Sequence, residues 1–416
     1  MDFLNISPRV EELAAQAEKL VEPYFRQIED IANYNSGKVL SAFRNNRVSD
    51  SIFGGTTGYG YNDAGRETLE AVYAEIFGAE AAIVRVNLVS GTHAITCSLF
   101  GVVKPGQKLV YVTGAPYDTL HGVIGISGDF PGSLKEYGIE YGQVEMTPVG
   151  KPDIQAIREA CRDKKVGAVG IQRSRGYSTR DSLSVEEIGE ICRAVKAVNP
   201  DINIFVDNCY GEFVEKLEPT QVGADLMAGS LIKNPGGGIA PSGGYIVGRA
   251  DLVERAAARM TAPGIGGECG ATLGNNRLMF QGLFMASHVV SQALKTAVFC
   301  AGMMELMGYE PSPRYCDTRR DIIQMVSFGK PEGVIAFCQG LQKGSPVDAF
   351  VTPEPCQTPG YDCPVIMAAG AFIQGASIEL SADAPMREPY TVYMQGGITF
   401  ESGRLGIMLA AEKLLG

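Results

Sequence analysis

The chain has 416 residues, of which 45% are hydrophobic and 20% are charged, a composition typical of a soluble globular protein. This length exceeds what one compact core of ordinary size holds, so we expect two domains. The net charge of −11 argues against nucleic acid or an anionic membrane surface as the main partner. A small anionic ligand remains compatible with this charge, because backbone N–H groups at a helix start bind an anion locally.

The ten cysteines are scattered without a CxxC pair, and the chain has only three His. This pattern does not predict a structural zinc site, and we expect no metal. We interpret the cysteines as reduced, buried thiols of a cytoplasmic protein. The first residues carry no basic segment followed by an apolar run, so no signal peptide is expected. The most apolar long stretch, about 278–307, contains charged residues at intervals and predicts a buried helix, not a membrane span.

The first predicted element is an amphipathic helix over about 7–34, with Pro8 in its first turn and apolar residues at helical spacing. We interpret residues 1–45 as a packing arm without a catalytic role. A loop rich in Gly and Tyr follows at 53–65, and a second helix is predicted from about 66 to 77.

From residue 81 the chain repeats a strand–loop–helix pattern. The predicted strands lie in the runs AAIVRVNLV, KLVYVTG, VGAVGIQ, INIFVDN, ADLMAGS and GGYIVG. Short apolar runs that alternate with helices predict an α/β domain with a mostly parallel sheet. We assign residues 46–290 to this large domain. Residues 291–416 are predicted to form a smaller domain of α/β or α+β type that closes with a helix.

Polar residues follow three of the predicted strands. Ser90–Gly91–Thr92 comes after the first strand, Asp207 ends the strand before CYGEF, and Lys233 stands between an apolar run and the sequence NPGGG. Ligands bind at the carboxyl ends of strands in such sheets. A Lys amine in a partly desolvated site has a lowered pKa and becomes a nucleophile toward an aldehyde. A carboxylate at Asp207 is suited to keep a pyridine nitrogen protonated.

The remaining candidates complete an anion site and a ring site. The turn Ser90–Gly91–Thr92 suits a phosphate, because the N–H groups and the dipole of a helix start favour an anion. Ser230, three residues before Lys233, can donate its hydroxyl to the same phosphate. Tyr117, after the strand KLVYVTG, can stack on a ring or transfer a proton.

Each of these residues also has an ordinary interpretation. Ser90 alone is typical of a helix N-cap, Asp207 alone of a turn, and Lys233 alone of a solvated surface position. Their shared placement at strand ends favours one common site over three separate structural roles.

Several motifs resemble the fold-type I pyridoxal-phosphate (PLP) enzymes of cysteine and methionine metabolism. These motifs are SGTHAI at 90–95, APYDTLHG at 115–122, FVDNCYGEF at 205–213 and AGSLIKNPGGG at 228–238. The likeness is strongest to the methionine gamma-lyase-like branch, also labelled aluminium-resistance proteins, whose patterns stand here as IQRSRGYS at 171–178 and SADAPMREPYTVYMQGG at 381–397. The resemblance covers nearly the whole chain. It implies a large domain with a mostly parallel seven-stranded sheet and a smaller C-terminal domain.

The resemblance also implies residue roles. Lys233 would carry PLP as a Schiff base and then act as the mobile acid and base, while Asp207 would pair with the pyridine nitrogen. Tyr117 would lie over the ring. Tyr59 matches a tyrosine that reaches the phosphate of the neighbouring subunit, which implies a homo-oligomer, dimer or tetramer, with shared active sites. The full set of expected cofactor contacts is Ser90, Gly91, Thr92, His93, Tyr117, Asp207, Ser230, Lys233 and Tyr59.

The sequence departs from the better-studied lyases at three places. Tyr61 stands where their tyrosine loop carries an arginine, and His93 stands where they usually have a small residue. Their substrate-binding arginine has no certain match. Arg387 is the first candidate to bind a substrate carboxylate, because the planar guanidinium suits a bidentate pair, and Arg173 and Arg404 are weaker candidates. A structural ion pair is the alternative role for Arg387.

The predicted function is a PLP-dependent carbon–sulfur lyase that acts on a small sulfur-containing amino acid, like methionine gamma-lyase or cystathionine beta-lyase. The products would be a thiol, ammonia and a 2-oxo acid, and Tyr117 would assist proton transfer to the leaving sulfur. Two alternatives stay open: another PLP reaction such as transamination, and a non-catalytic PLP-binding protein of metal tolerance. Against the second, nothing in the sequence resembles a hard-cation site of clustered carboxylates.

Overall fold

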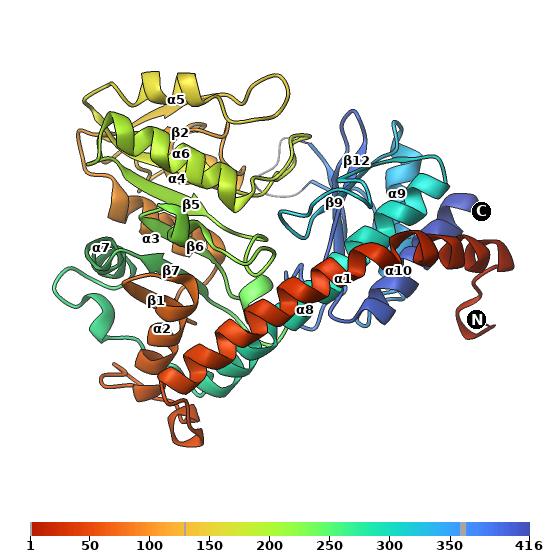
Figure 1. Cartoon of the computed structure of the whole chain (residues 1–416), viewed down its shortest axis with the longest axis horizontal. Coiled ribbons are helices and arrows are strands. Elements are labelled where there is room, and N and C mark those ends of the chain that lie inside the picture. The colour runs from red at the N-terminus through yellow and green to blue at the C-terminus, as the bar shows by residue number, and fades with distance from the viewer. Residues whose placement is uncertain (1, 129, 358–362) are drawn as a thin grey trace. The chain divides into compact units, whose positions relative to one another are not determined.

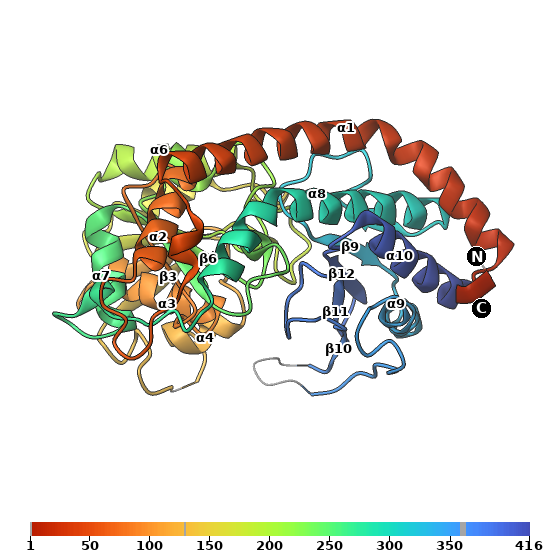
Figure 2. The same cartoon turned by 90° about the horizontal axis from the view of Figure 1, so that it is seen from below.

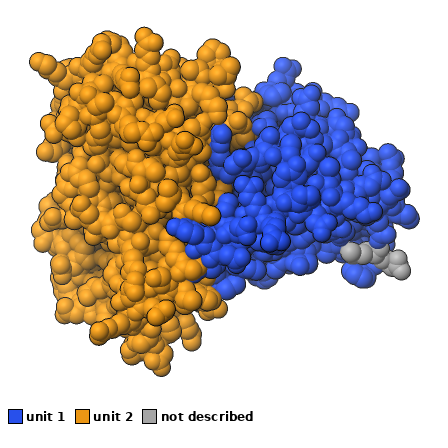
Figure 3. All heavy atoms as spheres, viewed as in Figure 1, with its two compact units in different colours: residues 1–36, 232–238, 285–416 blue, residues 37–231, 239–284 orange. Residues whose placement is uncertain are grey.

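A computed structural model describes residues 2–128, 130–357 and 363–416. The chain divides into two compact units, coloured separately in Figure 3. Unit 1 comprises residues 1–36, 232–238 and 285–416, and unit 2 comprises residues 37–231 and 239–284. Unit 1 is therefore discontinuous in sequence. Its boundary near residue 284 lies inside one long helix, a few residues before the boundary predicted at 290.

Unit 2 is built on a seven-stranded sheet in the order β1-β7-β6-β5-β4-β2-β3 (Figure 1). Its strands are β1 (Ala81–Arg85), β2 (Lys108–Tyr111), β3 (Glu140–Gln143), β4 (Val166–Gln172), β5 (Asn203–Asp207), β6 (Leu226–Ser230) and β7 (Gly244–Gly248). The ladder from β3 through β2, β4 and β5 to β6 is parallel, and only β7 runs antiparallel to its neighbours. The predicted mostly parallel sheet is confirmed. The six parallel strands all end at one edge, called the carboxyl edge below.

Helices cover the strands of unit 2. The helices are α2 (Ala64–Phe77), α3 (Gly91–Val102), α4 (Thr119–Ile124), α5 (Ile154–Ala160), α6 (Val185–Val198) and α7 (Ala250–Met260), with short 3-10 turns η2 (Asp50–Phe53), η3 (Pro219–Val222) and η5 (Gly266–Glu268). A side-chain cap begins four of these helices, α2, α3, α5 and α6. Ser184 and Glu187 form a reciprocal capping box at the start of α6. The α3 helix packs against α7 and β6, and side chains such as Leu99, Phe205 and Ala256 fill the buried core between them.

Unit 1 contains a second, smaller sheet in the order β10-β11-β12-β9-β8. Its elements are β8 (Glu310–Ser312), β9 (Gln324–Ser327), β10 (Val365–Ala368), β11 (Ser381–Pro385), β12 (Thr391–Gln395), α9 (Pro331–Lys343) and α10 (Phe400–Leu415), with 3-10 turns η1 (Asp2–Leu4) and η4 (Asn234–Gly236). Every strand pairing is antiparallel, which is the α+β form of the two predicted for this region. The helices α9 and α10 pack side by side, and α9 also contacts β10, β11 and β12 (Figure 2).

Two long helices, α1 (Pro8–Asn45) and α8 (Asn276–Leu306), contribute residues to both units. The predicted first helix ended near residue 34, but α1 continues because Asn35, Val39 and Ala42 keep one buried face at helical spacing. Within the described residues, α8 alone is long and apolar enough to cross a membrane. However, 72% of its most apolar window is buried inside the structure, as predicted for a core helix.

The glycine- and tyrosine-rich loop before α2 is fixed by a buried carboxylate, Asp63. One Asp63 oxygen accepts hydrogen bonds from Thr56 Oγ1 at 2.5 Å and from Thr272 Oγ1 at 2.6 Å. The other accepts from the Arg66 N–H at 3.0 Å and from Asn276 Nδ2 at 3.2 Å. Burial alone would raise the pKa of Asp63, but these four bonds outweigh it and lower the pKa to about 2. The ionised carboxylate therefore ties the loop to residues 272–276.

We expect Asp63→Asn to lower the free energy of unfolding by about 1–2 kcal/mol at pH 7, because two hydroxyl donors lose a charged acceptor. The folded pKa of Asp63 lies below its ordinary value of 3.8, so the contribution is full above that value and is lost as pH falls toward 2. The urea midpoints of the two proteins should therefore differ at pH 7 and converge near pH 2. Asp201→Asn, at an exposed position, is the control. Equal midpoints at pH 7 would contradict this role.

Candidate active site

The carboxyl edge brings the ends of β4, β5 and β6 together. Gln172 pairs in register with Asp207, and Asp207 pairs in register with Ala228, two residues before the end of β6. The Gln172 N–H donates to Thr113 Oγ1, just beyond β2, at 3.1 Å. Gln172 Oε1 is buried and finds no hydrogen-bond partner among the described residues. An unsatisfied buried acceptor beside a buried carboxylate is typical of a ligand site.

Asp207 is 6% exposed and held at this edge by the backbone around it. Its Oδ1 accepts a hydrogen bond from the Cys209 N–H at 3.1 Å, and its carbonyl accepts from the Arg173 N–H at 3.1 Å. Burial, and after it the negative charge of Asp207, raises the pKa of Tyr111 well above its ordinary value. Tyr111 Oη has no hydrogen-bond partner within the described ranges. The predicted position of Asp207 at a strand end is thus present in the structure.

The start of α3 forms an anion cradle against the end of β6. Ser90 is the N-cap, and its Oγ accepts a hydrogen bond from the His93 N–H at 3.1 Å. The N–H groups of Gly91 and Thr92 fall in the first turn, where a helix offers them no carbonyl partner. A Cβ on Gly91 would lie 3.0 Å from Ser230 Cβ, a tight contact, so a larger residue would push the helix start and Ser230 apart. The structure therefore brings Ser90, Gly91, Thr92 and Ser230 together.

His93 has a clear structural role beside this cradle. Its Nδ1 accepts a hydrogen bond from the Val89 N–H at 3.3 Å, so His93 and Ser90 cap the chain reciprocally. Burial, followed by the positive charge of Arg259, lowers the pKa of His93 and keeps the ring neutral at pH 7. A cofactor contact by His93 stays a prediction.

Tyr117 follows β2 and lies near the cradle. Its ring packs against the Tyr177 ring with centroids 5.9 Å apart. Two residues later, the hydroxyl of Thr119 lies 3.3 Å from that of Thr92, which links the start of α4 to the start of α3. This link ties the Tyr117 segment to the helix start that forms the cradle.

Lys233 stands three residues beyond Ser230, at the N-cap of η4, and is half-buried. The residues after it turn back sharply, since Gly237 and Gly238 take φ values of 55° and 68°. The segment 232–238 belongs to unit 1. Covalent geometry alone keeps the Cα atoms of Lys233 and Ser230 within about 11 Å.

The structure contradicts the prediction that Arg173 binds a substrate carboxylate. Its guanidinium is fully buried and donates to protein acceptors at Leu183, Asn208, Gly211 and Glu215. A buried guanidinium with these bonds serves the fold, because exchanging them for a ligand would leave buried acceptors unsatisfied.

The other candidate arginines lie in unit 1. Arg404, from α10, pairs with Glu18 of α1 and so has a structural role. Arg387 is exposed in the turn between β11 and β12, where its N–H donates to the Pro385 carbonyl at 2.8 Å. A substrate role for Arg387 stays a prediction.

Tyr59 projects from the loop that Asp63 anchors. It is 72% exposed, and its ring stacks on that of Tyr61, which is 52% exposed, with centroids 5.6 Å apart. The loop beneath is rigid: Arg66 is buried and donates through Nη1 to the carbonyls of Gly60 at 2.5 Å and Gly270 at 2.9 Å. The loop therefore displays two stacked aromatic rings to solvent.

Two site residues, Tyr111 and Gln172, were not predicted. Both end strands that the sequence did indicate, and polar atoms at the ends of KLVY and VGAVGIQ were the available signal. No group of three or more His, Cys, Asp or Glu within residues 2–128, 130–357 and 363–416 could hold a metal ion.

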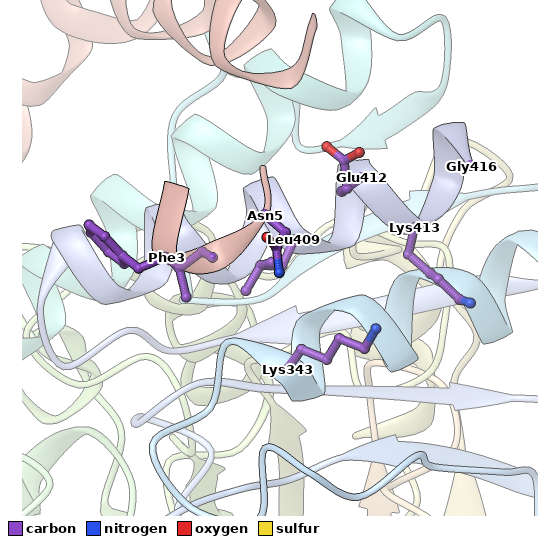
Figure 4. A pocket seen from close by; sticks show the side chains of 8 residues that line it. Phe3, Asn5, Lys343, Leu409, Glu412, Lys413 and Gly416 are labelled. Carbon is purple, nitrogen blue, oxygen red and sulfur yellow. The ribbon is translucent and has the colours of Figure 1, made fainter. Parts of the chain in front are cut away.

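Unit 1 also has a separate open pocket of about 500 Å³ (Figure 4). It lies between η1 and the C-terminal ends of α9 and α10, and Lys343 and Lys413 line it with Glu412. Glu412 accepts hydrogen bonds from the N–H and the hydroxyl of Ser7 at 3.0 and 2.8 Å, so its charge caps the start of α1. The pocket contains none of the predicted site residues.

Comparison with known proteins agrees with this architecture. The methionine gamma-lyase family model matches residues 10–415. The chain is 51% identical over 415 residues to the uncharacterized protein YnbB of Bacillus subtilis (strain 168). That match covers 100% of this chain and 98% of YnbB. Among solved structures, a carbon-sulfur lyase involved in aluminium resistance from Clostridium novyi NT has 50% identity and a TM-score of 0.96, and the match covers 99% of this chain and 97% of that chain.

A more distant structure supports the fold alone. The pyridoxal-5'-phosphate-dependent protein YhfS from Escherichia coli has 17% identity and a TM-score of 0.63, with 93% of this chain and 97% of that chain covered. The seven-stranded sheet with a second, smaller sheet is the predicted fold-type I architecture, which is confirmed.

We expect Gly91→Val to weaken binding of inorganic phosphate by about tenfold, since a branched side chain would push the helix start away from Ser230 and remove about one charge-assisted hydrogen bond. Titration calorimetry of the folded variant measures this. Gly37→Val, at an exposed helical position with open space around it, is the control. Unchanged phosphate affinity in Gly91→Val would place the anion elsewhere.

Proposed function

The chain belongs to the methionine gamma-lyase family, and from this premise we propose that it is a PLP-dependent carbon–sulfur lyase acting on a sulfur-containing amino acid. The observation that carries the proposal is the carboxyl edge of unit 2. There a buried Asp207 ends β5, and the anion cradle lies at the end of the next strand, β6. Ser230, which belongs to the cradle, stands three residues before Lys233. Asp207, the cradle and Lys233 would bind the pyridine nitrogen, the phosphate and the aldehyde carbon of one PLP molecule, respectively.

The residues present fit PLP. The N–H groups of Gly91 and Thr92, with the Ser230 hydroxyl, would hold the phosphate at the positive end of α3. Asp207 would face the pyridine nitrogen, and Tyr117 would lie over the ring. Lys233 would carry the cofactor covalently through Nζ. When bound, PLP supplies a protonated ring that withdraws electrons from the substrate's alpha carbon.

The protein's own groups would then move the protons and orient the substrate. Lys233 Nζ, once it is no longer bound to the cofactor, would be free to take the alpha proton of the substrate. Tyr117 delivers a proton to the sulfur as its bond to the beta or gamma carbon breaks. Arg387 is the proposed grip on the substrate carboxylate. A thiol leaves, and water replaces the amino nitrogen, so that ammonia and a 2-oxo acid are the other products.

We also propose that the active sites are shared in a homo-oligomer. The loop that carries the exposed rings of Tyr59 and Tyr61 is bonded to the backbone of Leu273, whose N–H donates to the Thr56 carbonyl at 3.0 Å and which is itself 63% exposed. Exposed apolar side chains on a hydrogen-bonded loop fit a contact with a second copy of the chain. Tyr59 would then reach the phosphate bound by the partner.

The cysteines favour a cytoplasmic setting for this enzyme. All ten are free thiols, of which six are buried as predicted, while Cys316 and Cys356 are exposed. Burial raises the pKa of Cys97 and Cys161 to about 11, so both stay protonated. Free, buried thiols are typical of a reducing compartment.

Lys233→Ala should lower kcat by roughly a thousandfold or more, because the amine that binds the cofactor and moves the alpha proton is removed. Release of thiol and ammonia from sulfur amino acids, without an added 2-oxo acid, measures turnover and separates lyase from aminotransferase. Borohydride reduction and peptide mapping of the wild-type protein should place the cofactor on Lys233. Lys104→Ala, on an exposed residue, is the control. Retained turnover in Lys233→Ala would refute the assignment.

Mixing subunits of Lys233→Ala with subunits of Tyr59→Ala should restore activity. Each mixed dimer would hold one site with both residues intact, so full exchange of equal amounts should return about a quarter of the wild-type rate. Either variant alone should stay nearly inactive. Exchange shown by mass spectrometry without any regained activity would mean that Tyr59 serves its own subunit or none.

A further inference from the structure

The guanidinium of Arg173 lies beside the carboxyl edge and donates through all three of its nitrogens. None of its side chain is exposed. Nη1 donates to Asn208 Oδ1 at 2.8 Å and to the Gly211 carbonyl at 2.9 Å. Nη2 donates to Glu215 Oε1 at 2.7 Å. Three acceptors therefore come from the segment that directly follows Asp207.

That segment is a tight turn with an unfavourable backbone. The Gly211 N–H donates to the Asn208 carbonyl at 2.9 Å, and Tyr210 between them takes φ of 73°. The left-handed conformation is unfavourable for a residue with a side chain, so the turn needs an outside restraint. The two bonds from Arg173 Nη1 fall on the first and last residues of this turn and supply it.

The turn and the guanidinium are fitted to each other. A Cβ on Gly211 would lie 2.5 Å from Arg173 Cδ, so any larger residue would displace the arginine. Asn208 is also held from its other side, since Nδ2 donates to Glu218 Oε2 at 3.1 Å. Glu218 in turn lies 3.6 Å from Arg173 Nη1 and accepts from the Phe213 N–H at 2.9 Å.

The second residue of this turn, Cys209, contacts the Asp207 carboxylate. The Cys209 N–H donates to Asp207 Oδ1 at 3.1 Å and so sets how the carboxylate is turned. The backbone N–H of Arg173 also donates to the Asp207 carbonyl at 3.1 Å. Arg173 therefore restrains Asp207 from both sides of the strand end without touching its carboxylate.

We propose that Arg173 is a positioning residue for the cofactor, which acts through the 208–211 turn to hold the Asp207 carboxylate toward the pyridine nitrogen. This rests on the proposed PLP function. A displaced carboxylate would no longer keep the ring nitrogen protonated, and loss of that positive charge would make the Lys233 nitrogen of the cofactor link more basic.

Arg173→Lys tests the proposal, because it keeps the charge but cannot make the forked bonds. The readout is the pH at which the visible band of the PLP-loaded protein changes. We expect this midpoint to rise by about one pH unit or more, in the same direction as in Asp207→Asn. Asn208→Ala removes one acceptor of the Arg173 guanidinium and keeps all the charges, so it should shift the midpoint in the same direction. If Arg173→Lys does not fold, the midpoint of Asn208→Ala tests the positioning role.

Arg319→Lys is the matched control. Arg319 is another buried arginine, which donates to Gln324 and to the Ala297 carbonyl within unit 1. Its replacement should lower thermal stability and leave the midpoint unchanged. If Arg173→Lys or Asn208→Ala folds, binds PLP and shows the same pH midpoint of its visible band as the wild-type protein, the positioning role is overturned.

A crystal structure of Arg173→Lys without cofactor separates this inference from the proposed function. We expect the bond from the Cys209 N–H to Asp207 Oδ1 to be lost or the carboxylate to be rotated. An unchanged carboxylate would overturn the inference on its own. A wild-type protein that gains no visible band with PLP would instead refute the proposed function, while the crystal structure would still judge the restraint.

Discussion

The parallel pairing of β4, β5 and β6 is the constraint on which the candidate chemistry depends. Parallel strands must end at the same edge, and the residue that ends each strand therefore faces the same region. This is why Gln172 and Asp207 are neighbours although 34 residues of sequence, 173–206, which include α6, lie between them. The glycine at the start of α3 adds the cradle, because it allows a helix dipole to reach Ser230.

Buried arginines fix the backbone of the loops around this edge by hydrogen bonds. Arg66 and Arg85 donate to backbone carbonyls in the 266–270 segment, and Arg173 does the same at Gly211. A buried charge needs polar partners, and the carbonyls of these loops supply them, so the conformation of each loop is coupled to its arginine. The loops are therefore restrained by polar geometry, and their apolar residues are free to face outward.

The sequence indicated the strand ends, but it could not distinguish an arginine that binds a ligand from an arginine that supports the fold. Asp207 and Lys233 were predictable, because a polar residue after a buried strand is conspicuous. Arg173 was misread because a guanidinium fork suits a ligand carboxylate and a protein carbonyl equally well, and only burial distinguishes them. The end of α1 was misplaced because Asn35 has low helix propensity, yet packing of its buried face overrides that preference. Strand pairing in unit 1 could not be predicted, since short apolar runs do not reveal their partners.

The discontinuity of unit 1 has a consequence for synthesis on the ribosome. Its first segment, residues 1–36, is synthesised before unit 2, while its main segment, 285–416, is synthesised after it. All of unit 2 is synthesised in between, and domains generally fold as they appear. The N-terminal half of α1 must therefore wait for its packing partners within unit 1 until residues 285–416 have been synthesised. Its amphipathic face would be exposed during that interval, a natural point for chaperone binding.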